Sequence, residues 1–479
     1  MAQELGRVVF SRDRYARSWS LGDRKNPICK TPILMQLSGD PEMETFLSPF
    51  NSKTDKNIPS TLSVSSKAAL SPPNFSDLSP NFESFIGHVL PPSLEEANAG
   101  EPAGSGQLLP VSWQRLSHDK SLLKSNLNPS IIVLVDSVQL ASQAGKLVKA
   151  IHVLKNKFPG SLLWTPGIGG PDNAAVLNWF GVDIFDLSRS RMCNSAGVIL
   201  SANGPRMPDE SMGESASMEV QIQHWKQSIA SIKSNLTNGT LRSLVDKQSL
   251  NSPNLVEHLR THDKICSQQE GLLSSHVDNE KILDCSSPNT LNDPVVNEWC
   301  DFISNQYTAP EGLDNVLILL PCSARKPYRL SKSHGRFIRA INSNSCHEVM
   351  VTSPLGLVPR DLEEIWPASH YDIPVTGDWT NDELIRTQTM LDSLLSRHKY
   401  NLVINHSSMK LNTGGVEIIE TRLDLSPGSS EALENLSNAV NESIQRFSVQ
   451  NRKSNHSLMD TFSSISRKQL KNDKWLEGV

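Results

Sequence analysis

The segment at 321–334, PCSARKPYRLSKSH, concentrates side chains that can do covalent and acid–base chemistry. It contains a thiol, an amine, a phenol and an imidazole, on Cys322, Lys326, Tyr328 and His334. A thiol beside cationic side chains has a lowered pKa and becomes a nucleophile. An arbitrary cysteine at a strand end is more often a small buried residue. The density of reactive groups in this segment favours a function.

The same segment predicts a proton-transfer or phosphate-binding role for its histidine. Ser331 and His334 are three residues apart, so a helical turn would put them on one face. From Pro321 to His347 there is no Asp or Glu, and six cations occur: Arg325, Lys326, Arg329, Lys332, Arg336 and Arg339. Such a run is a phosphate-binding patch about as often as it is a solvated basic loop.

Three short apolar runs, at 315–321, 347–354 and 401–408, are typical of strands covered on both faces. A helix is predicted at 381–398, with its N-cap at Thr380 or Asn381. In parallel sheets ligands bind outside the carboxyl ends of the strands. We therefore expect a small α/β domain in which the strand ends converge, bringing together Cys322, Lys326, Tyr328, Arg360 and His406.

The N-terminal half shows a βαβαβ pattern, with strands at 128–137, 161–167 and 182–188 and a helix at 139–158. This pattern is the unit of a parallel sheet or a (β/α) barrel. Early strands are expected within 1–47. Two or three helices are expected over 218–264, broken at Asn238-Gly239 and Ser252-Pro253.

Length and composition predict several domains. A chain of 479 residues exceeds one ordinary core. The expected parts are a barrel-like domain at 1–264 with a Ser/Pro-rich irregular stretch at 48–128, a linker and domain entry at 265–310, a catalytic domain at 311–450 and a polar tail at 451–479. The absence of an apolar run of about 18 residues or of a signal peptide predicts a cytoplasmic protein with no membrane partner.

Charge and cysteine content set further limits. The net charge of -5 argues by itself against a nucleic-acid partner, although the basic segment is a local exception. The seven cysteines are scattered and form no C-x-x-C pair, so neither a disulfide framework nor an intact zinc knuckle is indicated.

The segment 321–334 fits P-C-x3-K-P-Y-x2-S-x2-H at every fixed position and resembles the signature of archaeosine synthase, subunit alpha. The stretches 353–379 and 401–408 also resemble this family, so the likeness covers roughly 311–450. The resemblance implies a tRNA substrate that carries 7-cyano-7-deazaguanine in its D-arm. It further implies addition of free lysine as co-substrate to the nitrile, and a radical-SAM partner that completes the formamidine. Self-association of the chain is left open.

The resemblance also implies roles for individual residues. The catalytic set is Cys322, Lys326, Tyr328, Ser331 and His334. Tyr328 or His334 would protonate the nitrile nitrogen, and Cys322 would either add first as a thioimidate or line the pocket. The substrate-binding set is Arg325, Arg329, Ser353, Arg360, Asp372, Asp378 and His406. Of these, Asp372 or Asp378 would hold the amino group of the incoming lysine.

The N-terminal half resembles the tRNA-guanine transglycosylase barrel, through GVDIFDLSRSR at 181–191 and the helices that follow. Asp186 occupies the place of the base-exchange nucleophile in that family. The cysteine-rich zinc motif expected at 201–217 reads SANGPRMPDE instead, and only His224 would remain of it. We therefore predict a degenerate barrel without structural zinc, no other metal site and no firmly indicated cofactor.

Two alternatives stay open. The chain could be a transglycosylase that uses Asp186 for base exchange, or a non-catalytic tRNA-binding subunit. The intact motif argues against the second alternative, because binding alone does not require a thiol, a phenol and an imidazole together. Archaeosine synthases usually end in an RNA-binding domain of the PUA type, which this sequence does not display, so tRNA affinity is expected to come from elsewhere in the chain, from a partner or from a C-terminus that is missing here.

Overall fold

The computed structural model describes residues 6–22, 25–37, 40–51, 62–63, 108–118, 128–268, 282–373, 377–407 and 409–447. The chain divides into two compact units, residues 1–289 and 290–479. Most of the irregular stretch expected at 48–128, and all of the tail expected at 451–479, lie outside the described residues. No helix in the described part of the chain is long and apolar enough to cross a membrane.

The first unit begins with a three-stranded antiparallel sheet. Its strands are β1 (Arg7–Asp13), β2 (Ala16–Gly22) and β3 (Pro27–Lys30), in the order β1-β2-β3. The sequence predicted early strands in this region, and these are confirmed. Trp19 and Leu21 of β2 are buried, so the sheet packs one face on the rest of the unit.

Seven parallel strands form the main sheet of the first unit. They are β4 (Ile33–Gln36), β5 (Phe50–Asn51), β6 (Leu62–Ser63), β7 (Leu108–Val111), β8 (Ile131–Leu134), β9 (Leu162–Trp164) and β10 (Ile184–Phe185), in the order β6-β5-β4-β10-β9-β8-β7. The first of them, β4, thus pairs with the last, β10. First and last strands also pair in a (β/α) barrel. The predicted α/β class is confirmed, and the transglycosylase type of barrel stays a prediction.

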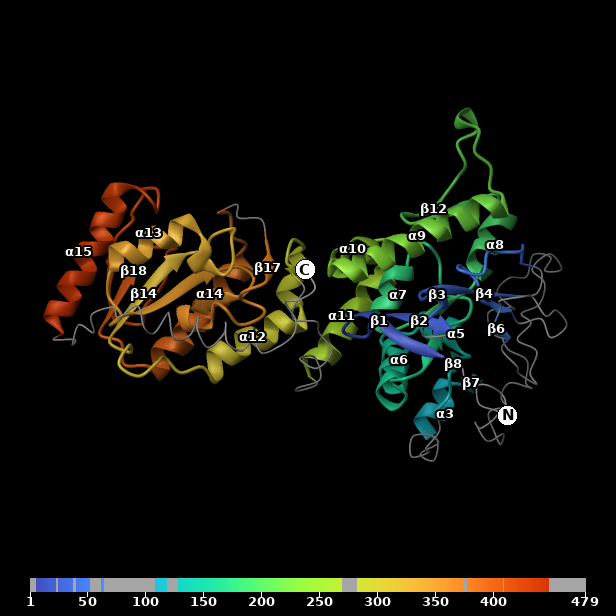
Figure 1. Cartoon of the computed structure of the whole chain (residues 1–479), viewed down its shortest axis with the longest axis horizontal. Helices are drawn as coiled ribbons and strands as arrows, with labels where there is room; N and C mark the ends of the chain where they lie inside the picture. The colour runs from blue at the N-terminus through green and yellow to red at the C-terminus, as the bar shows by residue number, and fades with distance from the viewer. Residues whose placement is uncertain are drawn as a thin grey trace. The chain divides into compact units, whose positions relative to one another are not determined.

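Helices surround this sheet (Figure 1). They are α3 (Trp113–His118), α5 (Ser137–Ala141), α6 (Lys146–Lys157), α7 (Ala174–Phe180), α8 (Ser188–Ser195), α9 (Met218–Asn238), α10 (Leu241–Ser249) and α11 (Pro253–Ser267). The breaks predicted at Asn238-Gly239 and Ser252-Pro253 are confirmed by the ends of α9 and α10. The single helix predicted at 139–158 is wrong, because Gly145 adopts a φ of 67° and separates α5 from α6.

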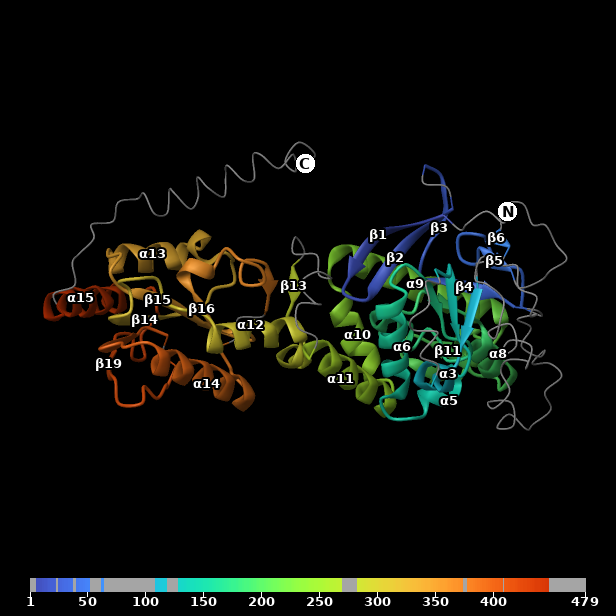
Figure 2. The ribbon, with the colours of Figure 1, turned by 90° about the horizontal axis from the view of Figure 1, so that it is seen from below.

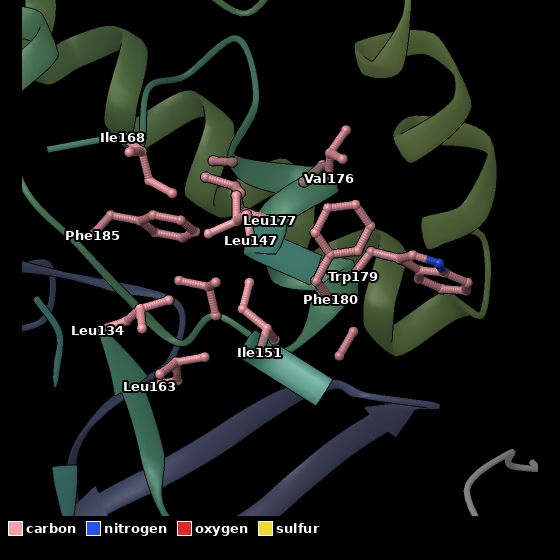
Figure 3. Packing of buried hydrophobic residues seen from close by; sticks show 14 of the residues in the cluster. Leu134, Leu147, Ile151, Leu163, Ile168, Val176, Leu177, Trp179, Phe180 and Phe185 are labelled. Carbon is pink, nitrogen blue, oxygen red and sulfur yellow. The ribbon is translucent and has the colours of Figure 1, made fainter. Parts of the chain in front are cut away.

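The core of the first unit lies between the helices and the parallel sheet. Leu147 and Ile151 of α6 pack near Leu134 of β8 and Leu163 of β9, and Trp179 extends from α7 toward the neighbouring helices (Figure 3). All five side chains are at most 1% exposed. Each fully buried side chain of this size stabilises the unit by roughly 1.5–3 kcal/mol.

A buried ion pair crosses the edge of this core. Lys155 Nζ lies 3.1 Å from Asp183 Oδ2, and both side chains are at most 2% exposed. Asp183 also accepts hydrogen bonds from Trp19 Nε1 at 3.1 Å and from the backbone N–H of Leu163 at 2.9 Å. The carboxylate therefore joins α6 to β2 and β9, and removing its charge would leave a buried ammonium without compensation.

The second unit is a five-stranded sheet. Its strands are β14 (Val316–Pro321), β15 (His347–Thr352), β16 (Gly356–Pro359), β18 (Leu402–Asn405) and β19 (Glu417–Glu420), in the order β16-β15-β14-β18-β19. Only β16 runs antiparallel to its neighbour. The three predicted strands are confirmed. Strand β19 was not predicted, because an edge strand with glutamates at both ends gives no continuous apolar run.

Helices cover both faces of this sheet (Figure 2). They are α12 (Pro294–Asn305), α13 (Lys332–Ile341), α14 (Asn381–Arg397) and α15 (Ser430–Arg446). Helix α14 begins at the predicted N-cap Thr380, where Glu383 completes a capping box. The stretch expected to be a linker at 265–310 contains α12, whose Trp299 donates a hydrogen bond to the carbonyl oxygen of Leu357 at 3.1 Å.

We expect Asp183→Asn to destabilise the first unit by about 3–5 kcal/mol, because it leaves Lys155 buried without a negative partner. Chemical denaturation followed by tryptophan fluorescence would measure the change. The control is Glu214→Gln, which breaks the exposed ion pair with Arg206 and should leave the unfolding curve unchanged. Equal effects of the two substitutions would show that the buried ion pair contributes no more to the free energy of unfolding than the exposed one.

Candidate active site

The carboxyl ends of β14 and β15 bring the segment 321–334 against a threonine. Pro321 of β14 pairs with Val351 of β15 in parallel register. The next residues, Cys322 and Thr352, therefore emerge at the same level of the sheet edge. These two residues and the loop that follows Cys322 therefore lie at the carboxyl edge of the sheet, which is where ligands bind in parallel sheets.

Three hydroxyl groups form a continuous chain at this edge. The phenol oxygen of Tyr371 in β17 (Tyr371–Asp372) lies 2.5 Å from Thr352 Oγ1 and contacts the phenol oxygen of Tyr328. All three side chains are at most 2% exposed. Burial raises the pKa of both Tyr328 and Tyr371, so both phenols stay protonated at neutral pH and act as hydrogen-bond donors.

Cys322 is partly buried beside this chain. Burial raises the pKa of its thiol, and the Lys326 cation and the Thr352 hydroxyl oppose that rise without cancelling it. The sequence predicted the opposite direction, because neighbouring cations alone would lower the pKa. The prediction was wrong on this point, since desolvation of the thiolate is the larger effect.

Lys326 lies over the ring of Tyr371, with Nζ 4.1 Å from the ring centroid. The attraction between an ammonium and an aromatic face holds the Lys326 side chain inside the site rather than in solvent. The geometry therefore joins three members of the predicted catalytic set, Cys322, Lys326 and Tyr328. It adds Thr352 and Tyr371, which were not predicted.

Ser331 and His334 lie at the start of α13. The Ser331 hydroxyl is the N-cap and accepts a hydrogen bond from the backbone N–H of His334 at 3.1 Å. The His334 ring is fully buried, packs 5.1 Å from the ring of Tyr328, and has its pKa lowered to about 3 by burial and by Arg360. His334 is therefore neutral at physiological pH.

Arg360 fixes the tautomer of this histidine. Its Nη2 donates to His334 Nδ1 at 3.1 Å, so the ring proton is on Nε2. Ion pairs with Glu348 at 2.8 Å and with Glu363 at 3.0 Å hold the guanidinium in place. The predicted substrate-binding role of Arg360 stays a prediction, and in this structure the residue positions His334.

The other predicted substrate-binding residues are distributed around this centre. Arg325 is exposed, and Arg329 forms an ion pair with Glu364. Ser353 hydrogen bonds to Glu383 at the start of α14. Asp372 and Asp378 are exposed.

His406 follows β18 and does not join the hydroxyl chain through any contact in the described residues. Its Nδ1 accepts from the Thr421 hydroxyl at 2.8 Å, and its Nε2 donates to the carbonyl oxygen of Pro427 at 2.9 Å. Phe337 lies beside it, with ring centroids 5.2 Å apart. Both nitrogens of His406 thus have partners within the fold, although the sequence placed it with Cys322.

Thr352, Tyr371 and Glu383 were missed for identifiable reasons. Thr352 looked like the ordinary end of a strand in HEVMVT, and Tyr371 sat beside the more conspicuous Asp372. Glu383 could have been noticed as the capping-box partner of Thr380. In no case does the sequence indicate that the side chain points toward Cys322 or Ser353.

In the first unit, Asp186 has its oxygens occupied. Oδ2 accepts from Trp164 Nε1 at 3.1 Å and from the Gly167 N–H at 2.9 Å, and Oδ1 accepts from the Ser188 N–H at 2.9 Å. The side chain is 1% exposed. This arrangement ties β9 to β10 and leaves the carboxylate little freedom to act as a nucleophile.

The segment at 201–217, where the resemblance placed a zinc motif, spans part of a hairpin of β11 (Ile199–Ser201) and β12 (Gly204–Arg206) and the loop after it. It projects away from the helices (Figure 1). An ion pair between Arg206 and Glu214 closes the loop. The prediction that this segment no longer binds zinc stays a prediction.

The raised pKa of Cys322 predicts slow alkylation at neutral pH. Labelling of the 321–334 peptide by iodoacetamide should increase with pH and reach half its maximum above the ordinary thiol pKa of about 8.5. Lys326→Met removes the cation that lowers the pKa and should move the profile to still higher pH, whereas Lys332→Gln should not. Mass spectrometry of the peptide measures both, and rapid labelling of the unaltered protein at pH 7 would contradict the raised pKa.

Comparison with known proteins places this site in a wider group. Residues 296–440 match a family described as "Domain of unknown function (DUF5591)". A crystal structure of a protein of unknown function is 22% identical and covers 30% of this chain and 49% of that one, with a TM-score of 0.23. A superposition this loose gives no information on function.

Three curated relatives are informative. Archaeosine synthase subunit alpha of Methanosarcina acetivorans is 28% identical over 88% of this chain and 69% of its own length. The subunit of the same name from Thermoplasma acidophilum is 32% identical over 57% of this chain and 52% of its own length. Archaeosine synthase of Haloferax volcanii is 28% identical over 64% and 55%.

The chain thus spans about two thirds of the first relative and about half of each of the other two. The first of these alignments takes in 88% of this chain. The intact segment 321–334 agrees with this likeness. The resemblance of this chain to the archaeosine synthase (subunit alpha) family is confirmed by its similarity to these relatives.

Proposed function

We propose that this protein acts in archaeosine biosynthesis, and that its second unit adds lysine to the nitrile of 7-cyano-7-deazaguanine in the D-arm of tRNA. The relatives named archaeosine synthase support the pathway. The observation that carries the chemistry is the grouping of Cys322 and Lys326 with the hydroxyl chain of Thr352, Tyr371 and Tyr328 at one sheet edge.

Addition to a nitrile needs a nucleophile at carbon and a proton at nitrogen. A nitrile is a weak electrophile, so the two must arrive together. The thiol of Cys322 supplies the nucleophile, and a hydroxyl of the chain supplies the hydrogen bond to nitrogen. Because burial keeps both phenols protonated, the hydroxyl that donates this hydrogen bond keeps its proton across the physiological pH range.

The covalent route is balanced in atoms and charge. The S–H bond of Cys322 breaks, a C–S bond forms to the nitrile carbon, and the proton passes to the nitrile nitrogen to give a thioimidate. The free ε-amine of lysine then attacks this carbon, the C–S bond breaks, and the amine proton returns to sulfur. The product is a substituted amidine, and the cysteine is regenerated.

Residues around the centre would orient the two substrates. The Lys326 cation stabilises the sulfur as it loses its proton, since it already lowers the pKa of Cys322. Arg360 holds His334 through a hydrogen bond, and the His334 ring packs against the Tyr328 ring and so positions the phenol. The exposed carboxylates of Asp372 and Asp378 are the candidates to bind the ammonium groups of lysine.

Helix α13 offers a surface for the tRNA backbone. Lys332, Arg336 and Arg339 are exposed and spaced by four and three residues, so they share one face. The exposed Arg325 lies in the loop that leads to this helix. With no acidic residue from 321 to 347, this surface has the charge that phosphate groups require.

The alternatives inferred from the sequence are less well supported. Base exchange by Asp186 would need a carboxylate free to attack the ribose, and its two oxygens already accept three hydrogen bonds. A binding-only subunit would not need the buried thiol and hydroxyl chain. A radical-SAM partner would be required to convert the lysine adduct to the final formamidine, and we propose it as the second protein of the pathway.

The lysine reaction is tested with tRNA carrying 7-cyano-7-deazaguanine and isotope-labelled lysine. Wild-type protein should give tRNA with one lysine attached through an amidine, detected by nucleoside mass spectrometry. Cys322→Ala and Tyr371→Phe should each slow the reaction by about 10²-fold or more, because each removes a group acting in the transition state. Cys346→Ala, at a buried cysteine before β15, is the matched control.

The outcomes separate the parts of the proposal. No adduct with wild-type protein would overturn the enzymatic assignment. Undiminished turnover by Cys322→Ala would remove the covalent route and leave direct attack by lysine. Release of guanine from unmodified tRNA, lost in Asp186→Asn, would instead establish base exchange.

The tRNA surface is tested by the triple substitution Lys332→Gln, Arg336→Gln and Arg339→Gln. Binding should weaken, and the slope of log K against log salt should decrease by about 2–3, because each lost phosphate contact releases roughly one fewer counterion. Lys399→Gln, an exposed cation at the other end of the sheet, is the control and should change neither quantity. An unchanged salt slope in the triple variant would place the tRNA elsewhere.

A further inference from the structure

Two helices of the first unit bring together a buried group of metal-binding side chains. His152 lies on α6, and His262 and Cys266 lie on α11. The last two are four residues apart, so they share a face of the helix. One donor atom from each of the three residues lies within 4.8 Å of the others, and all three side chains are at most 3% exposed.

The three side chains already contact one another, through the two different nitrogens of His262. His152 Nε2 lies 2.9 Å from His262 Nδ1, and His262 Nε2 lies 3.6 Å from Cys266 Sγ. With Zn–N bonds of about 2.0–2.1 Å and Zn–S bonds of about 2.3 Å, donor atoms on a tetrahedron are roughly 3.3–3.6 Å apart. An ion would use only one nitrogen of His262, so the three donor atoms, which lie within 4.8 Å of one another, would have to move closer together around it.

A metal ligand must be a neutral imidazole or a thiolate. The burial of His152 and His262 favours the neutral form of both rings. Only the Cys266 thiol would release one proton, and the resulting thiolate would offset part of the charge of the ion.

The surroundings close the site and balance its charge. Tyr15 packs edge-on against His152, with ring centroids 4.8 Å apart, and its phenol hydroxyl donates to Asn156 Oδ1 at 3.2 Å. Two buried cations, Arg242 and Arg14, lie close enough to His262 to act on it. Arg242 is paired with Asp246 at 3.1 Å and with Asp263 at 2.8 Å, so its charge is compensated.

We propose that His152, His262 and Cys266 bind one zinc ion that fastens α11 to α6. The donor set of two imidazoles and one thiolate suits zinc. The fourth coordination position would be filled by a water molecule or by a neighbouring group that moves slightly toward the ion. This site lies on residues other than the 201–217 segment, where the family resemblance placed a zinc motif. The inference is independent of nitrile chemistry in the second unit.

The proposal is tested on the full chain, produced in zinc-supplemented medium and freed of loosely bound metal. Elemental analysis by mass spectrometry should find about one zinc per chain. Cys266→Ser and His152→Gln should each lose most of it, and Cys193→Ser, at a partly buried cysteine of the same unit, should retain it. Circular dichroism of each variant separates loss of metal from loss of fold.

A second measurement does not depend on any variant. Wild-type protein unfolded with chelator and refolded with Co²⁺ should show the near-ultraviolet band of a thiolate–cobalt bond and should unfold at a higher temperature than protein refolded without metal. Protein with no zinc, no such band and the same unfolding temperature under both conditions would overturn the proposal. Zinc retained at wild-type level by folded Cys266→Ser protein would do the same.

Discussion

The parallel pairing of β14 with β15 is the constraint on which the candidate active site depends. Pro321 pairs with Val351, so the two chains leave the sheet together and Cys322 emerges level with Thr352. A shift of one residue in this register would turn Thr352 to the opposite face of the sheet and separate it from Tyr371. The apolar runs of both strands are buried on two faces, which keeps the two strands in the interior of the sheet.

Burial then determines the chemistry that this geometry can perform. Desolvation raises the pKa of Cys322, Tyr328 and Tyr371 and lowers that of His334, so the resting centre is a set of neutral groups beside the Lys326 ammonium. Such a centre suits a reaction in which a thiol adds and its proton is delivered to the substrate in the same step. It is poorly suited to a reaction that needs a preformed thiolate.

In the first unit, burial determines the role of two carboxylates, and that role is structural. Its parallel strands pair first with last, as in a barrel, yet the carboxylate at the end of β10 is used to join strands. Asp186 holds Trp164 and the Gly167 backbone, and Asp183 holds Lys155 and Trp19. Buried carboxylates that satisfy several donors stabilise a fold but lose the freedom required of a nucleophile.

The sequence by itself determined the α/β class, three strands of the second unit, the helix breaks after Asn238 and before Pro253, and the family resemblance, because apolar runs, turn residues and motif spacing are local properties. It also singled out Cys322, Lys326 and Tyr328, which the fold places close together. Only the tertiary structure decided that Tyr371 completes the hydroxyl chain, that His406 points to Thr421 and Pro427, and that the pKa of Cys322 is raised. Each of these depends on which side chains meet across the fold and on how much water they exclude. Neither can be predicted from the spacing of residues along the chain.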